Sequence, residues 1–250
     1  MSQDIIVHGV EWTVKELFVY PNEFIYWSIQ IVMYPYMTGL VAGAFVLSSL
    51  YHVFGQKDLK EIAQFSLVFS LALLPVAALP LLLHLQQPLR AMEPLLTPHF
   101  TSAIAAFGIV FTAYGLIVVS EIWFVYREYF VHQLETLKDA PGFWNAQRRV
   151  VYKVLTVGAR DVSAEAVEVD HKAAKILAGI GIPVACFLHG YAGFIFGSVK
   201  ANALWMSPLM PVIFIMSAVV SGIALCMLTY IVIMEWQAFR KRRQGGAEAA

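Results

Sequence analysis

Charged residues are scarce in this chain. Asp, Glu, Lys and Arg supply 14% of the 250 residues and hydrophobic residues supply 59%, whereas about 25% of a soluble domain is charged. The mean hydropathy is +0.68. Seventeen basic residues balance seventeen acidic ones, and we expect no nucleic-acid partner. The composition excludes an ordinary soluble domain and indicates an integral membrane protein.

Cysteine is nearly absent as well. The two cysteines, Cys186 and Cys226, both lie inside apolar runs, and the sequence contains no C-x-x-C pair. An iron–sulfur cluster held by this chain is therefore unsupported, as is a disulfide framework. No Walker sequence, glycine-rich nucleotide loop or zinc-protease helix is recognisable, and we expect no metal site. If electrons pass through this protein, the metal centres belong to its partners.

The first twenty residues lack the pattern of a secretory signal. They carry Asp4, Glu11, Lys15 and Glu16 instead of a basic start followed by an apolar core. We therefore expect no cleavable signal peptide.

Long apolar runs make up most of the sequence. A helix needs about 20 apolar residues to cross a hydrocarbon core of ~30 Å. About five runs qualify: residues 24–54, 62–85, 101–126, 173–199 and 209–236. The sequence predicts an all-α, polytopic transmembrane helix bundle that forms a single domain over residues 1–250. We expect it in the inner (cytoplasmic) membrane.

Lysine and arginine are unevenly distributed between the connections. Lys57 and Lys60 follow the first run, several basic residues lie in or beside the loop 128–170, and four more occupy 240–243. The connections on the opposite side carry few. Because basic residues are retained on the cytoplasmic side, we expect the N-terminus outside, the C-terminus in the cytoplasm and 128–170 as a cytoplasmic loop.

A histidine and a tyrosine interrupt the fourth apolar run. Polar groups that persist inside hydrocarbon usually face a bundle interior and have a function. Glycines at 190, 193 and 197 leave space beside His189 and Tyr191 for a close helix or a flat ligand. The predicted topology places this segment near the outer face. Further polar or aromatic residues are expected at that depth: Trp27, Tyr34, His84 and Arg90.

Several of these residues have simpler interpretations. Trp27 is typical of the aromatic belt at a membrane interface, and His84 and Arg90 could be ordinary polar residues at a helix end. Within the polar loop, residues 143–153 form either a short basic amphipathic helix on the inner leaflet or an irregular connector. The tail 244–250 is expected to be disordered.

Four segments together resemble the NrfD/PsrC family. They are Pro21–Trp27, the Gly39-x3-Gly43 pair, the turn Leu85–Arg90 and the segment His189–Phe194. The likeness extends from about residue 21 to residue 230. Residues 97–102 and 200–211 are most similar to the DsrP branch of that family, which belongs to a membrane complex of sulfur metabolism.

The resemblance implies a haem-free, quinone-interacting membrane subunit of a respiratory complex, with menaquinone or ubiquinone as its cofactor. It implies a quinone pocket at the outer face beside a periplasmic ferredoxin-like iron–sulfur subunit, with other membrane and cytochrome subunits in the complex. The family's histidine-glycine-tyrosine maps onto His189–Tyr191 and its arginine onto Arg90. Where the family often has an acidic residue and a glycine, this chain has His84 and Gln86.

A quinone needs a flat apolar slot, hydrogen-bond donors for its oxygens and a proton route. His189 and Tyr191 can donate, and histidine can relay protons near neutral pH. Trp27 and Tyr34 are candidates to line the slot. On the inner side, the candidates for a proton path are Glu121, Asp170 and His171.

The resemblance leaves one mismatch, because the family is built of eight to ten spans and this sequence offers about five. Either a second polypeptide supplies the remaining helices or the sequence is a shortened form.

Two other functions fit parts of the sequence. A haem b anchor would pair outer His84 and His189 with inner His52 and His171, but the fifth run has no histidine. A transporter would line a path with the polar residues, but no internal inverted repeat is evident.

Overall fold

The structure is a computed structural model that describes residues 6–7, 10–11, 29–84, 88–99, 103–198 and 205–248. Apart from a hairpin of two-residue strands, β1 (Ile6–Val7) and β2 (Val10–Glu11), the described residues form helices and their connections. The α-helices are α1 (Ile29–His52), α2 (Lys60–His84), α3 (Glu93–Leu96), α4 (Ala103–Thr136), α5 (Phe143–Leu155), α6 (Ala164–Gly197) and α7 (Met210–Glu248). Two 3₁₀ helices, η1 (Lys57–Leu59) and η2 (Pro88–Met92), precede α2 and α3.

Five helices are long and apolar enough to cross a membrane: α1, α2 with η1, α4, α6 and α7. The predicted all-α bundle of about five spans is therefore confirmed. The direction in which the spans cross stays a prediction.

The helices are longer than the apolar runs that predicted them. Helix α4 continues to Thr136 and α6 begins at Ala164, so helix occupies most of the segment 128–170 that was predicted as a loop. Local bonds stabilise these polar turns: Ser163 caps α6 by accepting from the Ala166 amide, and Lys172 pairs with Glu168 at 2.8 Å. Hydropathy reports only the part of a helix that lies in lipid.

Two other parts of the prediction are settled by the helices themselves. Residues 143–155 form α5, so the predicted helix is confirmed and the irregular connector is wrong, while its place on the inner leaflet stays a prediction. Helix α7 runs to Glu248, so the disorder predicted from residue 244 is wrong as far as that residue.

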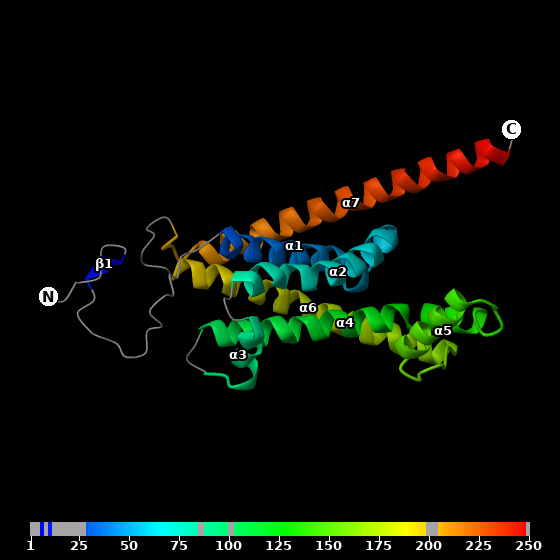
Figure 1. The fold of residues 1–250 in the computed structure, drawn as a ribbon, viewed down its shortest axis with the longest axis horizontal. Coiled ribbons are helices and arrows are strands. Elements are labelled where there is room, and N and C mark those ends of the chain that lie inside the picture. The colour runs from blue at the N-terminus through cyan, green and yellow to red at the C-terminus, as the bar shows by residue number, and fades with distance from the viewer. Residues whose placement is uncertain are drawn as a thin grey trace.

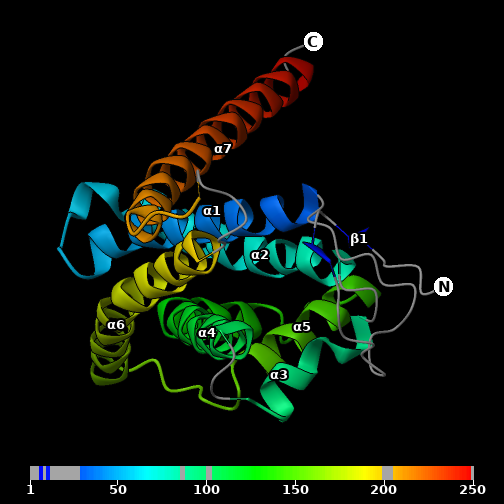
Figure 2. The same cartoon turned by 90° about the vertical axis from the view of Figure 1, so that its left-hand side faces the viewer.

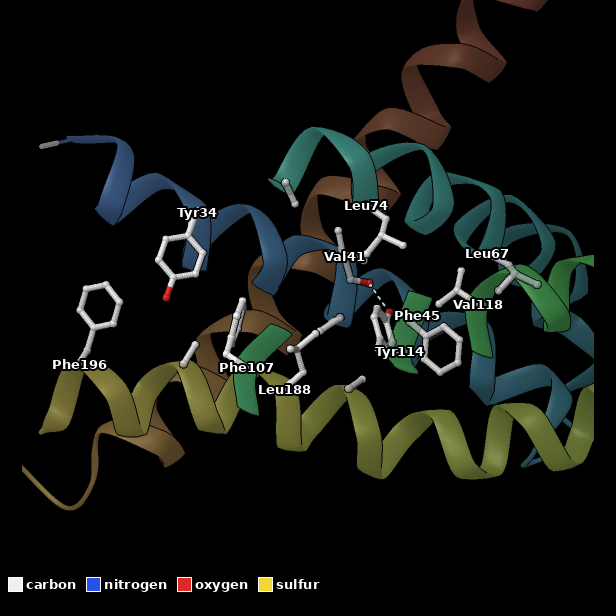
Figure 3. Packing of buried hydrophobic residues seen from close by; sticks show 14 residues of the cluster. Tyr34, Val41, Phe45, Leu67, Leu74, Phe107, Tyr114, Val118, Leu188 and Phe196 are labelled. Carbon is white, nitrogen blue, oxygen red and sulfur yellow. Dashed lines mark hydrogen bonds between the residues drawn. The ribbon is translucent and has the colours of Figure 1, made fainter. Parts of the chain in front are cut away.

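Helices α1, α2, α4 and α6 form a four-helix bundle, and α7 packs on its side. Helix α1 packs on α2, α6 and α7, and α4 packs on α6 and α2 (Figures 1 and 2). The last part of α7 leaves the bundle (Figure 1). Large side chains from the four inner helices fill the centre, among them Phe45, Leu67, Tyr114 and Leu188 (Figure 3).

Glycines allow close packing between helices, as two contacts of α1 illustrate. The Phe45 ring occupies the space that a Cβ atom at Gly181 would need. Helix α7 meets α1 at two glycines, because a Cβ atom at Gly222 would lie 2.6 Å from Gly43 Cα and 2.7 Å from the Leu40 carbonyl oxygen. Glycine at these positions is therefore required for contact between the helices.

Candidate functional site

A cavity of about 240 Å³ lies between α1, α6 and α7. It is at the end of the bundle where α1 and α7 begin and α6 ends, which we call the cavity end. Apolar and aromatic side chains dominate its wall. The lining residues are Val32, Pro35 and Tyr36 of α1, His189 and Phe196 of α6, Met210, Ile213, Phe214 and Ser217 of α7, and Trp205 just before α7.

His189 is the imidazole in this wall. The side chain is only 5% exposed, and its ring lies 5.6 Å from that of Phe214, centroid to centroid. The His189 Nδ1 atom has no hydrogen-bond partner among the described residues. Buried polar atoms are normally hydrogen-bonded, so an unpaired nitrogen in the wall of a cavity is a candidate to bind a polar group of a ligand.

A glycine on the facing helix makes room for this imidazole. A Cβ atom at Gly39 would lie 2.8 Å from His189 Cε1. The Gly39-x3-Gly43 pattern therefore has two separate uses: Gly39 accommodates the histidine, and Gly43 meets α7.

Aromatic rings line the cavity together with the imidazole and give it flat walls. The Phe196 ring lies 5.5 Å from Phe214 and 5.6 Å from Trp205. Tyr34 stands behind Phe196, with ring centroids 6.3 Å apart, and the two side chains point toward one another from α1 and α6 (Figure 3). Tyr34 also makes an edge-to-face contact with Phe107 at 5.7 Å. Such walls suit a planar, apolar ligand.

The cavity opens through the side of the bundle. Val32 and Tyr36 on α1 and Ile213 on α7 are each more than half exposed, while His189 opposite them is buried. The opening of the cavity is therefore on the side of the bundle, between α1 and α7.

Of the residues predicted for this site, His189 lines the cavity and Tyr34 supports its wall. Tyr191 does neither. Two residues along a helix correspond to a rotation of ~200°, and Tyr191 accordingly packs against Phe187 and Phe194, at 5.7 and 5.8 Å, on another face of α6. Trp27 lies outside the described residues.

The other two predicted residues lie beyond the cavity wall. His84 is the last residue of α2, and Arg90 in η2 is exposed and pairs with Glu93 at 2.7 Å. The hydrogen bond from Arg90 lowers the pKa of the Glu93 carboxyl from its ordinary value of 4.5. The structure thus keeps Arg90 in a surface ion pair at the cavity end.

Glu121, predicted on the inner side, is fully buried in α4. Neither carboxyl oxygen has a hydrogen-bond partner among the described residues, and the same holds for the buried Ser48 hydroxyl of α1. An unpaired carboxylate is very costly in an apolar interior. The role of Glu121 in a proton path stays a prediction.

Asp170 is engaged in a buried ion pair that sequence reasoning missed. Arg127 Nη2 lies 2.7 Å from Asp170 Oδ2, and Arg127 Nε donates to both carboxylate oxygens at 2.8 and 3.0 Å. Arg127 Nη1 donates to the Asp161 carbonyl oxygen at 2.5 Å. We call this group the Arg127–Asp170 clamp. It joins α4, α6 and the connection before α6, while the adjacent His171 is exposed.

A signal for the clamp was present in the sequence. Arg127 directly follows the apolar run 101–126, and Asp170 shortly precedes the run 173–199. Successive spans in opposite directions place both residues at the same membrane boundary. Opposite charges at one depth were therefore candidates to pair.

The chain matches the family described as polysulphide reductase, NrfD, over residues 20–245. It belongs to the NrfD family. It is also a multi-pass integral membrane protein, given the five apolar helices. The predicted resemblance to the NrfD/PsrC family is confirmed, and its closeness to the DsrP branch stays a prediction.

Relatives of this NrfD family member come from distant organisms. A selenate reductase subunit from Mesobacillus selenatarsenatis is 35% identical over 204 residues, which cover 82% of this chain and 47% of that protein. A putative dimethyl sulfoxide reductase membrane subunit from Halobacterium salinarum is 27% identical over 218 residues, covering 87% and 46%. Protein NrfD of Escherichia coli is 24% identical over 210 residues, covering 82% and 60%. The chain thus spans about half the length of the relatives it matches.

Proposed function

We propose that this protein is the haem-free, quinone-interacting membrane subunit of a multi-subunit respiratory reductase. Its role is to exchange electrons between the menaquinone or ubiquinone pool and a periplasmic iron–sulfur partner. Two relatives named as subunits of selenate and dimethyl sulfoxide reductases support a reductase complex. The observation that carries the proposal is the apolar cavity in which buried His189 has an unpaired nitrogen.

The residues of the cavity match what a quinone head group requires. Phe196, Phe214 and Trp205 supply flat apolar walls. The volume of about 240 Å³ is below the ~300–1,000 Å³ typical of drug-sized ligands, and suits one planar ring system. His189 donates a hydrogen bond to a quinone oxygen and relays a proton to or from it. The opening between α1 and α7 leaves a path for an isoprenoid tail into lipid.

The distribution of basic residues supports the orientation. In the proposed orientation the cavity end lies at the outer face, and Arg240–Arg243 lie in the cytoplasm of an inner-membrane protein. A periplasmic iron–sulfur subunit then docks near the quinone, and cytochrome subunits complete the chain of carriers. We further propose that Glu121, with His171 and Asp170 nearer the cytoplasm, serves proton movement, although the ion pair with Arg127 makes Asp170 the least available of the three.

The likeness to the DsrP branch suggests that the complex acts in sulfur metabolism. This part of the proposal rests on residues 97–102 and 200–211, and a substrate profile of the purified complex tests it.

The decisive experiment measures quinol-dependent electron transfer by the intact complex in His189→Gln and Tyr191→Phe variants. Glutamine keeps a hydrogen-bond donor but cannot relay a proton, and this loss is expected to lower kcat by about 10²–10⁴-fold, the usual contribution of a positioned acid or base. Tyr191→Phe is the matched control, because its ring lies on another face of α6 and the rate should be unchanged. A normal rate in His189→Gln with a loss in Tyr191→Phe would move the site to that other face.

A further inference from the structure

Helix α5 has two faces, and only one has a partner among the described residues. On the first face, Arg149 donates from Nε to the Leu137 carbonyl oxygen at 3.0 Å and from Nη2 to that of Ala140 at 3.2 Å. The Tyr152 ring lies 6.3 Å from those of Tyr129 and Phe130. This face is fixed to the last turns of α4.

The second face is exposed and mostly apolar, with Gln147 as its polar member. Helical geometry places five side chains on one stripe of this face, and each is more than half exposed: Phe143, Trp144, Val150, Val151 and Val154. Arg148 and Lys153, both exposed, flank the stripe on its two sides. The helix contains no acidic residue. A stripe of this composition with basic edges is typical of helices in the membrane interface.

The position of α5 along α4 places it at the right depth. The Leu155 carbonyl oxygen accepts a hydrogen bond from Trp123 Nε1 at 2.8 Å. Trp123 lies in the last turn of the apolar run 101–126, where the span leaves the hydrocarbon. Tryptophan and tyrosine concentrate at this level of a membrane protein, as Tyr126 and Tyr129 do here. The C-terminal half of α5 therefore reaches the membrane boundary.

We propose that α5 is a lipid-binding helix at the membrane interface. Its apolar stripe lies among the head groups and upper acyl chains of the adjacent leaflet. Arg148 and Lys153 reach outward from the two edges and bind the phosphates of anionic lipids. The contacts with α4 fix the orientation of the stripe, so the helix is already ordered before lipid binds.

The first test places an environment-sensitive nitrobenzoxadiazole label on Val151→Cys in the full-length protein, with Cys186 and Cys226 replaced by alanine. Ala146→Cys is the control, an exposed residue of α5 about 140° around the helix from Val151. In phosphatidylcholine–phosphatidylglycerol nanodiscs, the label at 151 should emit at shorter wavelength than the label at 146. Equal, water-like emission at both positions would overturn the proposal.

The second test measures lipid preference as quenching of the label at 151 by spin-labelled phosphatidylglycerol relative to phosphatidylcholine. The Arg148→Gln/Lys153→Gln variant should lose about fivefold of the preference for each charge removed, since one basic residue near the surface contributes that much to anionic-lipid binding. The Lys138→Gln/Arg160→Gln variant is the control, because both residues are exposed but lie outside α5.

Three further outcomes would overturn the lipid assignment. Shielding of position 151 only in the assembled complex would identify a partner protein as the occupant of the stripe. Shielding that rises with protein concentration would identify a second copy of the chain. Equal quenching by both lipids would remove the anionic recognition.

Discussion

Helix α6 carries a buried ionisable side chain near each end, and the two have opposite surroundings. Asp170 at the clamp end receives bonds from Arg127, which also binds the Asp161 carbonyl oxygen. His189 lies about 28 Å further along the helix, beside a cavity, with an unpaired Nδ1 atom. A satisfied buried charge stabilises one packing of the helices, whereas an unpaired buried group beside a cavity is a candidate to bind a ligand. The comparison separates a structural ion pair from the proposed quinone site within one helix.

Removing one partner of the clamp should produce the largest loss of stability. Arg127→Ala leaves the Asp170 carboxylate buried and unpaired, and we expect the free energy of unfolding in mixed micelles to fall by about 3–5 kcal/mol. The measurement is unfolding by sodium dodecyl sulfate, followed by circular dichroism. The Arg127→Leu/Asp170→Leu variant should recover most of the loss because no lone charge remains. An Arg127→Ala protein as stable as the wild type would show that the clamp contributes nothing.

The contact between α1 and α7 should be the next most sensitive. Gly222→Ala places a Cβ atom against Gly43 Cα and the Leu40 carbonyl oxygen, and we expect a loss of about 1–3 kcal/mol from overpacking. Gly179→Ala is the matched control, since no heavy atom lies within 4 Å of its added Cβ atom. That variant should be at least as stable as the wild type, because alanine favours helix over glycine. Equal effects of the two variants would contradict the close packing.

A smaller change at the cavity end should affect binding more than stability. Gly39→Ala pushes the His189 imidazole away from α1, since the added Cβ atom would lie 2.8 Å from Cε1. We expect KM for quinol to rise about tenfold, equivalent to about 1.4 kcal/mol, with a smaller change in kcat. The comparison is Gly115→Ala, whose Cβ atom meets Leu74 at an ordinary 3.4 Å. If both variants keep the wild-type KM, the imidazole does not contact the quinol.

The smallest effect is expected at the exposed pair of Arg90 and Glu93. Because Arg90 lowers the pKa of the Glu93 carboxyl below its ordinary value of 4.5, its stabilisation is present above that value and disappears as the pH falls through the lowered pKa. Melting temperatures of the wild type and Glu93→Gln should therefore differ slightly at neutral pH and converge in acid. A difference that persists in strong acid would assign the effect to a contact other than the charge.

The spans were predictable because a membrane-crossing helix must be apolar for about 20 residues. His189 was predictable because a histidine inside such a run is costly without a function. Tyr191 could not be separated from it, since residues 189 and 191 share a sequence motif but not a helix face. The wall formed by Phe214 and Ser217 was also hidden, because apolar residues that face lipid and those that face a cavity look alike in sequence. Only the neighbouring helices distinguish them.

The contact between Gly43 and Gly222 can form only late in biosynthesis. The two glycines are made far apart in time: at ~5–20 residues per second, the interval between them is roughly 10–35 s. Until then α1 has no α7 beside it, and Ile213, Phe214 and Ser217 are missing from the cavity wall. A nascent chain with four inserted spans therefore has His189 in place and no enclosed site. The cavity is completed by the last of these five helices to enter the membrane, so any binding in it follows the synthesis of α7 and cannot guide it.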